Sequence, residues 1–134
     1  MNLNFFEKFT LKLVTSFILL ISIALSLNIH IFGKISAGGG FQAGALLASG
    51  IIIFEFCNEV RLISKNHLNI LTFAGLSVYF ATGFASLFLN GSLFEYSIFH
   101  EEYGHIIGSF CVETAVLLVV TSAMLRISHL ISNK

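Results

Sequence analysis

The length of its uncharged apolar runs constrains this chain most. From Leu13 to Gly33 the sequence has 21 residues without a formal charge, between Lys12 and Lys34. At about 1.5 Å per residue, a helix of this length crosses a hydrocarbon core of about 30 Å. A cleaved signal peptide would have a shorter apolar region, followed directly by a small-x-small cleavage site. Leu13 to Gly33 is therefore predicted to remain as a transmembrane helix.

Three further apolar runs follow, and a turn dipeptide, Asn90-Gly91, comes before the last of them. With 56% hydrophobic residues, 10% charged residues and a mean hydropathy of +0.91, the 134-residue chain is too apolar for a soluble domain of its size. We predict an all-α integral membrane protein. Residues 1–134 would form a single membrane domain, with four transmembrane helices at about 13–33, 41–60, 70–89 and 106–125.

Basic residues are divided unequally between the two sides that four crossings define. The side with both termini and the middle loop holds Lys8, Lys12, Arg61, Lys65, Arg126 and Lys134, whereas the other side holds only Lys34. Because cytoplasmic loops carry an excess of Lys and Arg, this split predicts cytoplasmic termini and an external loop from Asn90 to His105. The expected location is the cell (inner or plasma) membrane, as a multi-pass protein.

A glycine-rich stretch, Ser36-Ala37-Gly38-Gly39-Gly40-Phe41-Gln42-Ala43-Gly44, opens the second run. Gly40, Gly44 and Ala48 recur every four residues and form a small-residue ridge, which lets membrane helices approach closely. The stretch lacks the GxxxxGK[ST] and GxGxxG patterns of nucleotide-binding loops. We therefore expect helix packing, or contact between protein subunits, from Gly38, Gly39, Gly40, Phe41, Gly44 and also Gly108.

Two acidic residues, Glu55 and Glu113, lie within the predicted helices. An ionisable group at membrane depth costs roughly 2.5 to 3.5 kcal/mol on insertion scales, so both are candidates for an ion or proton path. Counted from the helix starts, Glu55 lies about 21 Å and Glu113 about 10 Å below the outer boundary. Carboxylates about 10 Å apart in depth cannot share a proton, so no catalytic dyad is expected.

Each acid also has an alternative interpretation. Glu55 is close enough to the inner boundary to reach the headgroups, or to pair with Arg61 or Lys65. Glu113 has no such exit, and its alternatives are a polar contact with a partner protein or a structural hydrogen bond.

Other chemistry is disfavoured by what the sequence lacks. It has no Ser/His/Asp or Cys/His arrangement and no HExxH, so an enzyme is not expected, and no catalytic residue is assigned. Two outer histidines with Glu101 or Glu102 could in principle ligate a haem or metal. The histidines are placed at the boundaries of the predicted spans, where such residues commonly face water, so no cofactor or metal is expected. The zero net charge gives nucleic-acid binding no electrostatic basis. The histidines near the outer face are His30, His100 and His105, and those near the inner face are His67 and His129.

The stretch Gly38 to Gly44 follows an apolar helix that ends in Asn28, His30 and Gly33. It resembles the MnhB (also called MrpB) family, whose members are small membrane subunits of multisubunit sodium/proton antiporters. That family carries Pro-Gly-Gly-Gly-Phe-x-Gly-Gly here, so Ala37 and Ala43 are departures from its pattern. The resemblance extends to Gly104-His105-Ile106-Ile107-Gly108-Ser109, to Glu113-Thr114 and to the run from Leu117 to Met124, and covers most of the chain.

The resemblance implies a small membrane subunit of a multisubunit Na+ (monovalent cation)/H+ antiporter, which supports assembly and is a candidate contributor to the cation path. Its partners would be the other subunits, the lipid bilayer, Na+ or another monovalent cation, and H+. The alternative is a self-contained small proton-coupled transporter that acts as a homodimer, with Glu113 or Glu55 as proton carrier. A redox or haem protein would need paired histidines inside spans.

The predicted topology is testable with a single cysteine, Ser92→Cys, in a chain whose Cys57 and Cys111 are replaced by serine. Because Ser92 follows the third crossing, we expect a membrane-impermeant thiol reagent to label it from outside intact cells. Labelling from the cytoplasmic side alone would reverse the topology.

Overall fold

The computed structural model describes residues 4–33, 39–88, 92–95 and 104–132. Four helices lie in this part of the chain: α1 (Phe5–Phe32), α2 (Gly40–Asn58), α3 (Lys65–Phe88) and α4 (Gly104–Ser132). All four are long and apolar enough to cross a membrane. The predicted fold class, all-α with four transmembrane helices, is confirmed. Gly38 and most of the predicted external loop lie outside the described residues.

Three of the helices extend beyond the predicted crossings into polar sequence. α1 begins at Phe5, because the backbone N–H of Asn4 donates to Oε2 of Glu7 at 2.8 Å and so starts the helix early. α3 begins at Lys65, and α4 continues past Leu125 to Ser132. Charged residues such as Lys, Glu and Arg are good helix formers, so a charge that ends an apolar run need not end a helix.

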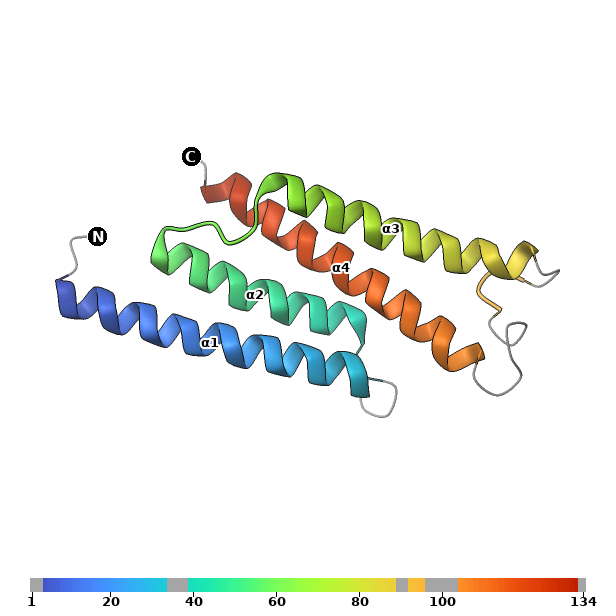
Figure 1. Cartoon of the computed structure of the whole chain (residues 1–134), viewed down its shortest axis with the longest axis horizontal. Coiled ribbons are helices and arrows are strands. Elements are labelled where there is room, and N and C mark those ends of the chain that lie inside the picture. Colours follow the sequence, from blue (N-terminus) through green and yellow to red (C-terminus); the bar gives the residue numbers. More distant parts are fainter. Residues whose placement is uncertain (1–3, 34–38, 89–91, 96–103, 133–134) are drawn as a thin grey trace.

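The helices form a single layer in the order α1, α2, α4, α3 (Figure 1). α2 packs between α1 and α4, and α4 packs between α2 and α3. The start of α1 and the end of α4 lie at the same end of the layer, together with the connection between α2 and α3 (Figure 1). This arrangement agrees with an even number of crossings.

The small-residue ridge of α2 lies directly against α4. A Cβ atom added to Gly40 would stand 1.9 Å from the backbone oxygen of Glu113, and one added to Gly44 would stand 2.8 Å from that of Leu117. The hydroxyl of Thr121 donates to the Gly44 carbonyl at 3.2 Å, and Ala48 is fully buried. The absence of side chains at Gly40 and Gly44 therefore permits backbone-to-backbone packing.

α2 uses a second set of small residues toward α1. The hydroxyl of Ser26 donates to the Ala43 carbonyl at 2.8 Å, and Ala43 itself is fully buried. A Cβ added to Gly50 would stand 2.5 Å from the Cβ of Ser22. The alanine that departs from the family pattern at position 43 thus lies in a close contact with α1.

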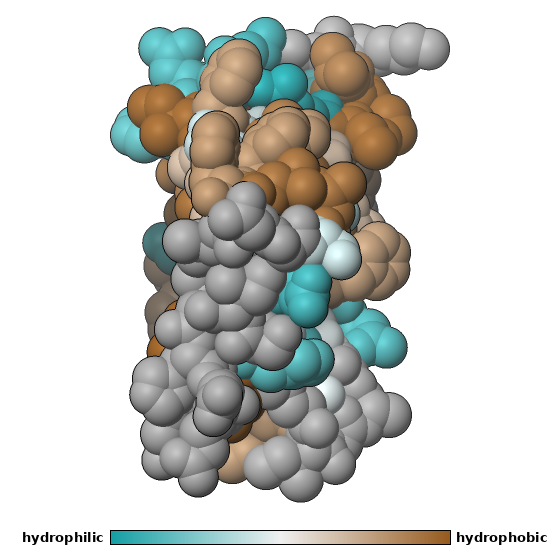
Figure 2. Space-filling view, turned by 90° about the vertical axis from the view of Figure 1, so that its right-hand side faces the viewer, coloured by the Kyte–Doolittle hydropathy of each residue, from teal (hydrophilic) through white to brown (hydrophobic). Residues whose placement is uncertain are grey.

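Few large side chains are buried in this layer. Within the described residues, the core cluster consists of Ile51, Leu68 and Leu125. Large apolar side chains face outward, and brown apolar side chains form much of the surface seen outside the grey residues in Figure 2. Lipid or another protein must cover such a surface, as expected for a membrane-spanning layer.

Beyond α3, residues 92–95 fold back on the helix. Phe94 has a positive φ of 63° and donates its backbone N–H to the hydroxyl of Ser86 at 3.0 Å, while its ring covers Gly83. In the same turn, the backbone N–H of Ser92 donates to Oε2 of Glu95 at 2.8 Å, and this hydrogen bond lowers the pKa of that exposed carboxyl from its usual value.

Substituting alanine at Gly40 tests the close packing of α2 on α4. A methyl group there would clash with the backbone of Glu113, so we expect Gly40→Ala to destabilise the protein by about 1 to 3 kcal/mol or more. Gly39→Ala is the matched control, because no atom lies within 4 Å of an added Cβ at that position and its φ of 171° suits any residue. Thermal unfolding in detergent measures both, and equal stability of the two variants would contradict the packing.

Candidate functional site

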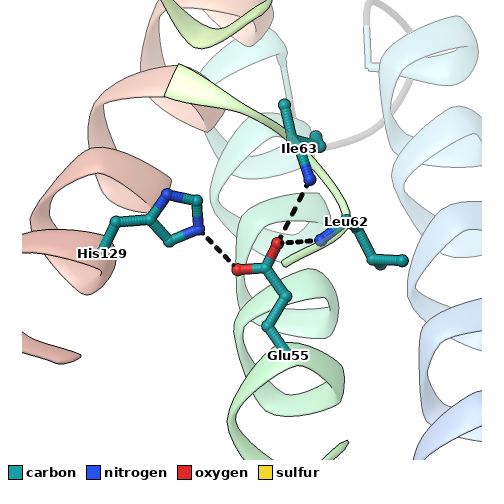
Figure 3. A network of polar contacts seen from close by, with 4 residues as sticks. All are labelled: Glu55, Leu62, Ile63 and His129. Atoms are coloured by element: carbon teal, nitrogen blue, oxygen red, sulfur yellow. Dashed lines mark hydrogen bonds and ion pairs between the residues drawn. The ribbon is translucent and has the colours of Figure 1, made fainter. Parts of the chain in front are cut away.

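Glu55 is the centre of a buried polar network at the end of the layer that holds the start of α1 and the end of α4 (Figure 3). Its Oε2 lies 2.7 Å from Nε2 of His129 on α4. Its Oε1 accepts backbone N–H groups from Leu62 at 2.7 Å and Ile63 at 3.4 Å. Glu55 is 7% exposed and His129 is 5% exposed. The carboxylate is therefore buried and bonded rather than extended to the headgroups.

The local sequence explains why the α2–α3 connection returns to Glu55. α2 ends at Asn58 because Glu59 is in the left-handed region, with φ 53°, and its backbone N–H bonds the carbonyl of Glu55. The chain then reverses and presents the backbone N–H groups of Leu62 and Ile63 to the carboxylate. One side chain thus links α2 to the connection and to α4.

His129 is a partner that the sequence did not predict. The predicted fourth crossing ended at Leu125, which left His129 in the aqueous phase, whereas α4 continues to Ser132 and buries the ring. A signal was present in the spacing, since His129 lies seven residues after Ser122 and four after Leu125, both on the buried face. Pairing with Arg61 or Lys65 was one of the alternatives for Glu55, whose side chain instead contacts the imidazole of His129.

Glu113 lies at the opposite end of the α2–α4 contact. The backbone of Glu113 packs on Gly40, the first residue of α2. Glu55 lies near the other end of the same helix, so the two acids are about 22 Å apart along the helix direction. The expected difference of about 10 Å was too small, because it placed the starts of α2 and α4 at equal depth. α4 in fact begins at Gly104 and extends past the start of α2. The inference that the acids cannot share a proton holds.

His30 is buried beside Glu113, contrary to the expectation that it faces water. It is 7% exposed, and its Nε2 lies 3.1 Å from the hydroxyl of Thr114, the neighbour of Glu113. Its ring packs on Phe110 with centroids 4.8 Å apart. α1, α2 and α4 therefore meet at a polar site made by His30, Gly40 and the Glu113-Thr114 pair.

Three buried side-chain atoms lack a hydrogen-bond partner in the described part of the chain. They are Nδ1 of His30, Oε2 of Glu113 and Nδ1 of His129. All three belong to ionisable groups. A buried polar atom without a partner is costly, and it indicates a ligand such as water, an ion or a group from another protein. Across residues 4–33, 39–88, 92–95 and 104–132, no three His, Cys, Asp or Glu side chains gather to hold a metal ion.

The predicted glycine contacts have different surroundings. Gly40 and Gly44 pack within the chain, and Gly108 is buried on α4. Gly39 caps α2 in open space, and Phe41 points outward with 64% of its surface exposed. Of these residues Phe41 alone is shown exposed enough to contact a neighbouring protein, and that contact stays a prediction.

These features define a class: a multi-pass membrane protein with a thin helical layer that buries carboxylate and imidazole groups and leaves its apolar flanks exposed. Residues 10–126 match the family described as a domain related to the MnhB subunit of the Na+/H+ antiporter. The chain belongs to this family and is thus a subunit of a multisubunit Na+/H+ antiporter. No curated protein and no solved structure matches it.

The Glu55–His129 contact is testable by substitution at the ring. His129→Leu would leave the carboxylate buried without its imidazole, and we expect it to lower the stability by about 3 to 5 kcal/mol. Glu55→Gln keeps an acceptor for the Leu62 N–H and a polar atom facing His129, so it should cost less. Chemical unfolding in mild detergent measures both. A smaller loss for His129→Leu than for Glu55→Gln would contradict the network.

Proposed function

We propose that this chain supports assembly of the antiporter through its exposed apolar faces and contributes Glu113, and secondarily Glu55, to the ion or proton path. Membership of the MnhB family supports a role in Na+/H+ exchange. The observation that carries the choice of residue is the buried Oε2 of Glu113, which has no hydrogen-bond partner among the described residues.

Glu113 is the stronger candidate because one of its two carboxylate oxygens is buried without a hydrogen-bond partner among the described residues. No described residue hydrogen-bonds its Oε2. His30, whose Nε2 contacts Thr114, adds a second unpartnered atom, Nδ1, at the same level. A cation, a proton or a basic group of a neighbouring protein would satisfy the carboxylate. In a Na+/H+ antiporter, the ions that would reach Glu113 are Na+ or another monovalent cation and H+.

Glu55 is the weaker candidate because its oxygens are already occupied. Two backbone N–H groups bond Oε1 and His129 bonds Oε2, so an arriving ion would have to displace an existing contact. Such a group suits a structural role. The two acids thus differ in availability as well as in position.

The proposed orientation places the Glu55 end in the cytoplasm. Basic residues are concentrated at the end where α1 starts and α4 finishes (Figure 1): Lys8, Lys12, Arg61, Lys65 and Arg126. The positive-inside rule therefore supports cytoplasmic termini in the cell membrane. Glu113 would then lie toward the external side.

Substitution at Glu113 tests the proposed path. Glu113→Gln keeps the size of the side chain but removes its charge, so we expect Na+/H+ exchange in membrane vesicles to fall by at least about tenfold while the complex still assembles. Glu113→Asp keeps the charge on a shorter arm and should retain part of the exchange.

The matched control is Glu95→Gln, which makes the same chemical change at an exposed carboxyl outside the helices. Exchange should be unaffected in this variant. Full exchange in Glu113→Gln would make Glu113 a structural residue. If less complex assembles but the exchange per assembled complex is unchanged, Glu113 serves contact between subunits.

A further inference from the structure

A cavity of about 910 Å³ opens at the end of the layer that carries both chain ends. Its walls come from the first turns of α1, the end of α2 with the residues that follow it, and the last turns of α4. The side-chain amide of Asn58, the last residue of α2, donates to the hydroxyl of Thr15 at 3.0 Å, so α2 ends level with Thr15. The ten residues of α1 that start at Phe5 and precede Thr15 therefore project about 15 Å beyond α2. Figure 1 shows this projection, which makes one side of the cavity.

Two lysines of α1 give the cavity its basic side. Lys8 and Lys12 lie one helical turn apart and both line it, and their ammonium groups make no ion pair with any described residue. Two acids also line the cavity. Glu55 is already bonded to His129 and to two backbone N–H groups, and the charge of Glu59 is offset by that of Arg61, which lines the cavity as well. The two ammonium groups therefore favour an anion.

The lining also contains apolar surface, and this narrows the kind of anion. Phe56 and Leu11 line the same cavity, and Phe56 is 79% exposed. The cavity would hold roughly 30 waters at about 30 Å³ each, far more than a small inorganic anion needs. A ligand that fits both surfaces has an anionic head for the lysines and an acyl chain for the aromatic side chain.

From these contacts we infer that the cavity binds the headgroup of a net-anionic phospholipid, with its phosphate at Lys8 and Lys12 and its acyl chain along Phe56. Basic pockets between membrane helices are suited to such headgroups, because the lysines neutralise the phosphate while the lipid tail stays in the apolar phase. The site is remote from Glu113, the main candidate for the ion path. Glu55 lines the cavity but takes no part in the proposed lipid contact, so lipid binding does not rest on the proposed ion path.

The test measures lipid retention by the full-length chain, purified in mild detergent with the subunits it retains and supplied with equal amounts of phosphatidylglycerol and phosphatidylcholine. Native mass spectrometry should show preferential retention of phosphatidylglycerol. Each lysine near a charged headgroup is worth about fivefold in binding, so Lys8→Gln with Lys12→Gln should reduce retention by about 25-fold.

Lys65→Gln is the matched control, because Lys65 begins α3 at the same end but does not line the cavity. It should leave retention unchanged, and circular dichroism should show the same helix content in all variants. Equal retention of the two lipids, or equal losses in the control and the double variant, would overturn the proposal. Displacement of the lipid by millimolar inorganic phosphate would show a phosphate site that needs no lipid and would also overturn it.

Discussion

The backbone contact between α2 and α4 at Gly40 and Gly44 is the constraint on which the other features depend. It sets α2 against the middle of α4 rather than against its first turn, and so offsets the two helices along their axes. That offset brings Glu113 level with the start of α2 and brings His129 to Glu55 near the end of α2. The two polar sites are thus opposite ends of one helix contact.

The layer that results is thin, and it is completed from outside. α2 and α4 each have helix neighbours on two sides, whereas α1 and α3 form the edges (Figure 1). The packing inside uses alanine, glycine and hydroxyl groups, while large apolar side chains face outward. Small residues and hydrogen bonds, rather than burial of large side chains, hold membrane helices together. This division suits a protein whose outer faces meet lipid and neighbouring subunits.

The sequence predicted the number of helices, because long uncharged runs have few other structures available in a membrane. It also predicted the ridge at Gly40 and Gly44, since a spacing of four residues defines one helix face. It did not predict the Glu55–His129 pair, because the axial offset of α2 and α4 depends on which turns interlock. The burial of His30 was missed for the same reason, as residues near the end of a run were assigned to water.

This chain is one subunit of a larger antiporter, with α2 and α4 packed closely against each other. The most direct measurement is purification from gently solubilised membranes, followed by a Na+/H+ exchange assay of the reconstituted material. We expect the chain to be recovered together with large antiporter-like subunits, and exchange only when they are present. A homodimer of this chain that exchanges Na+ for H+ without other subunits would contradict it.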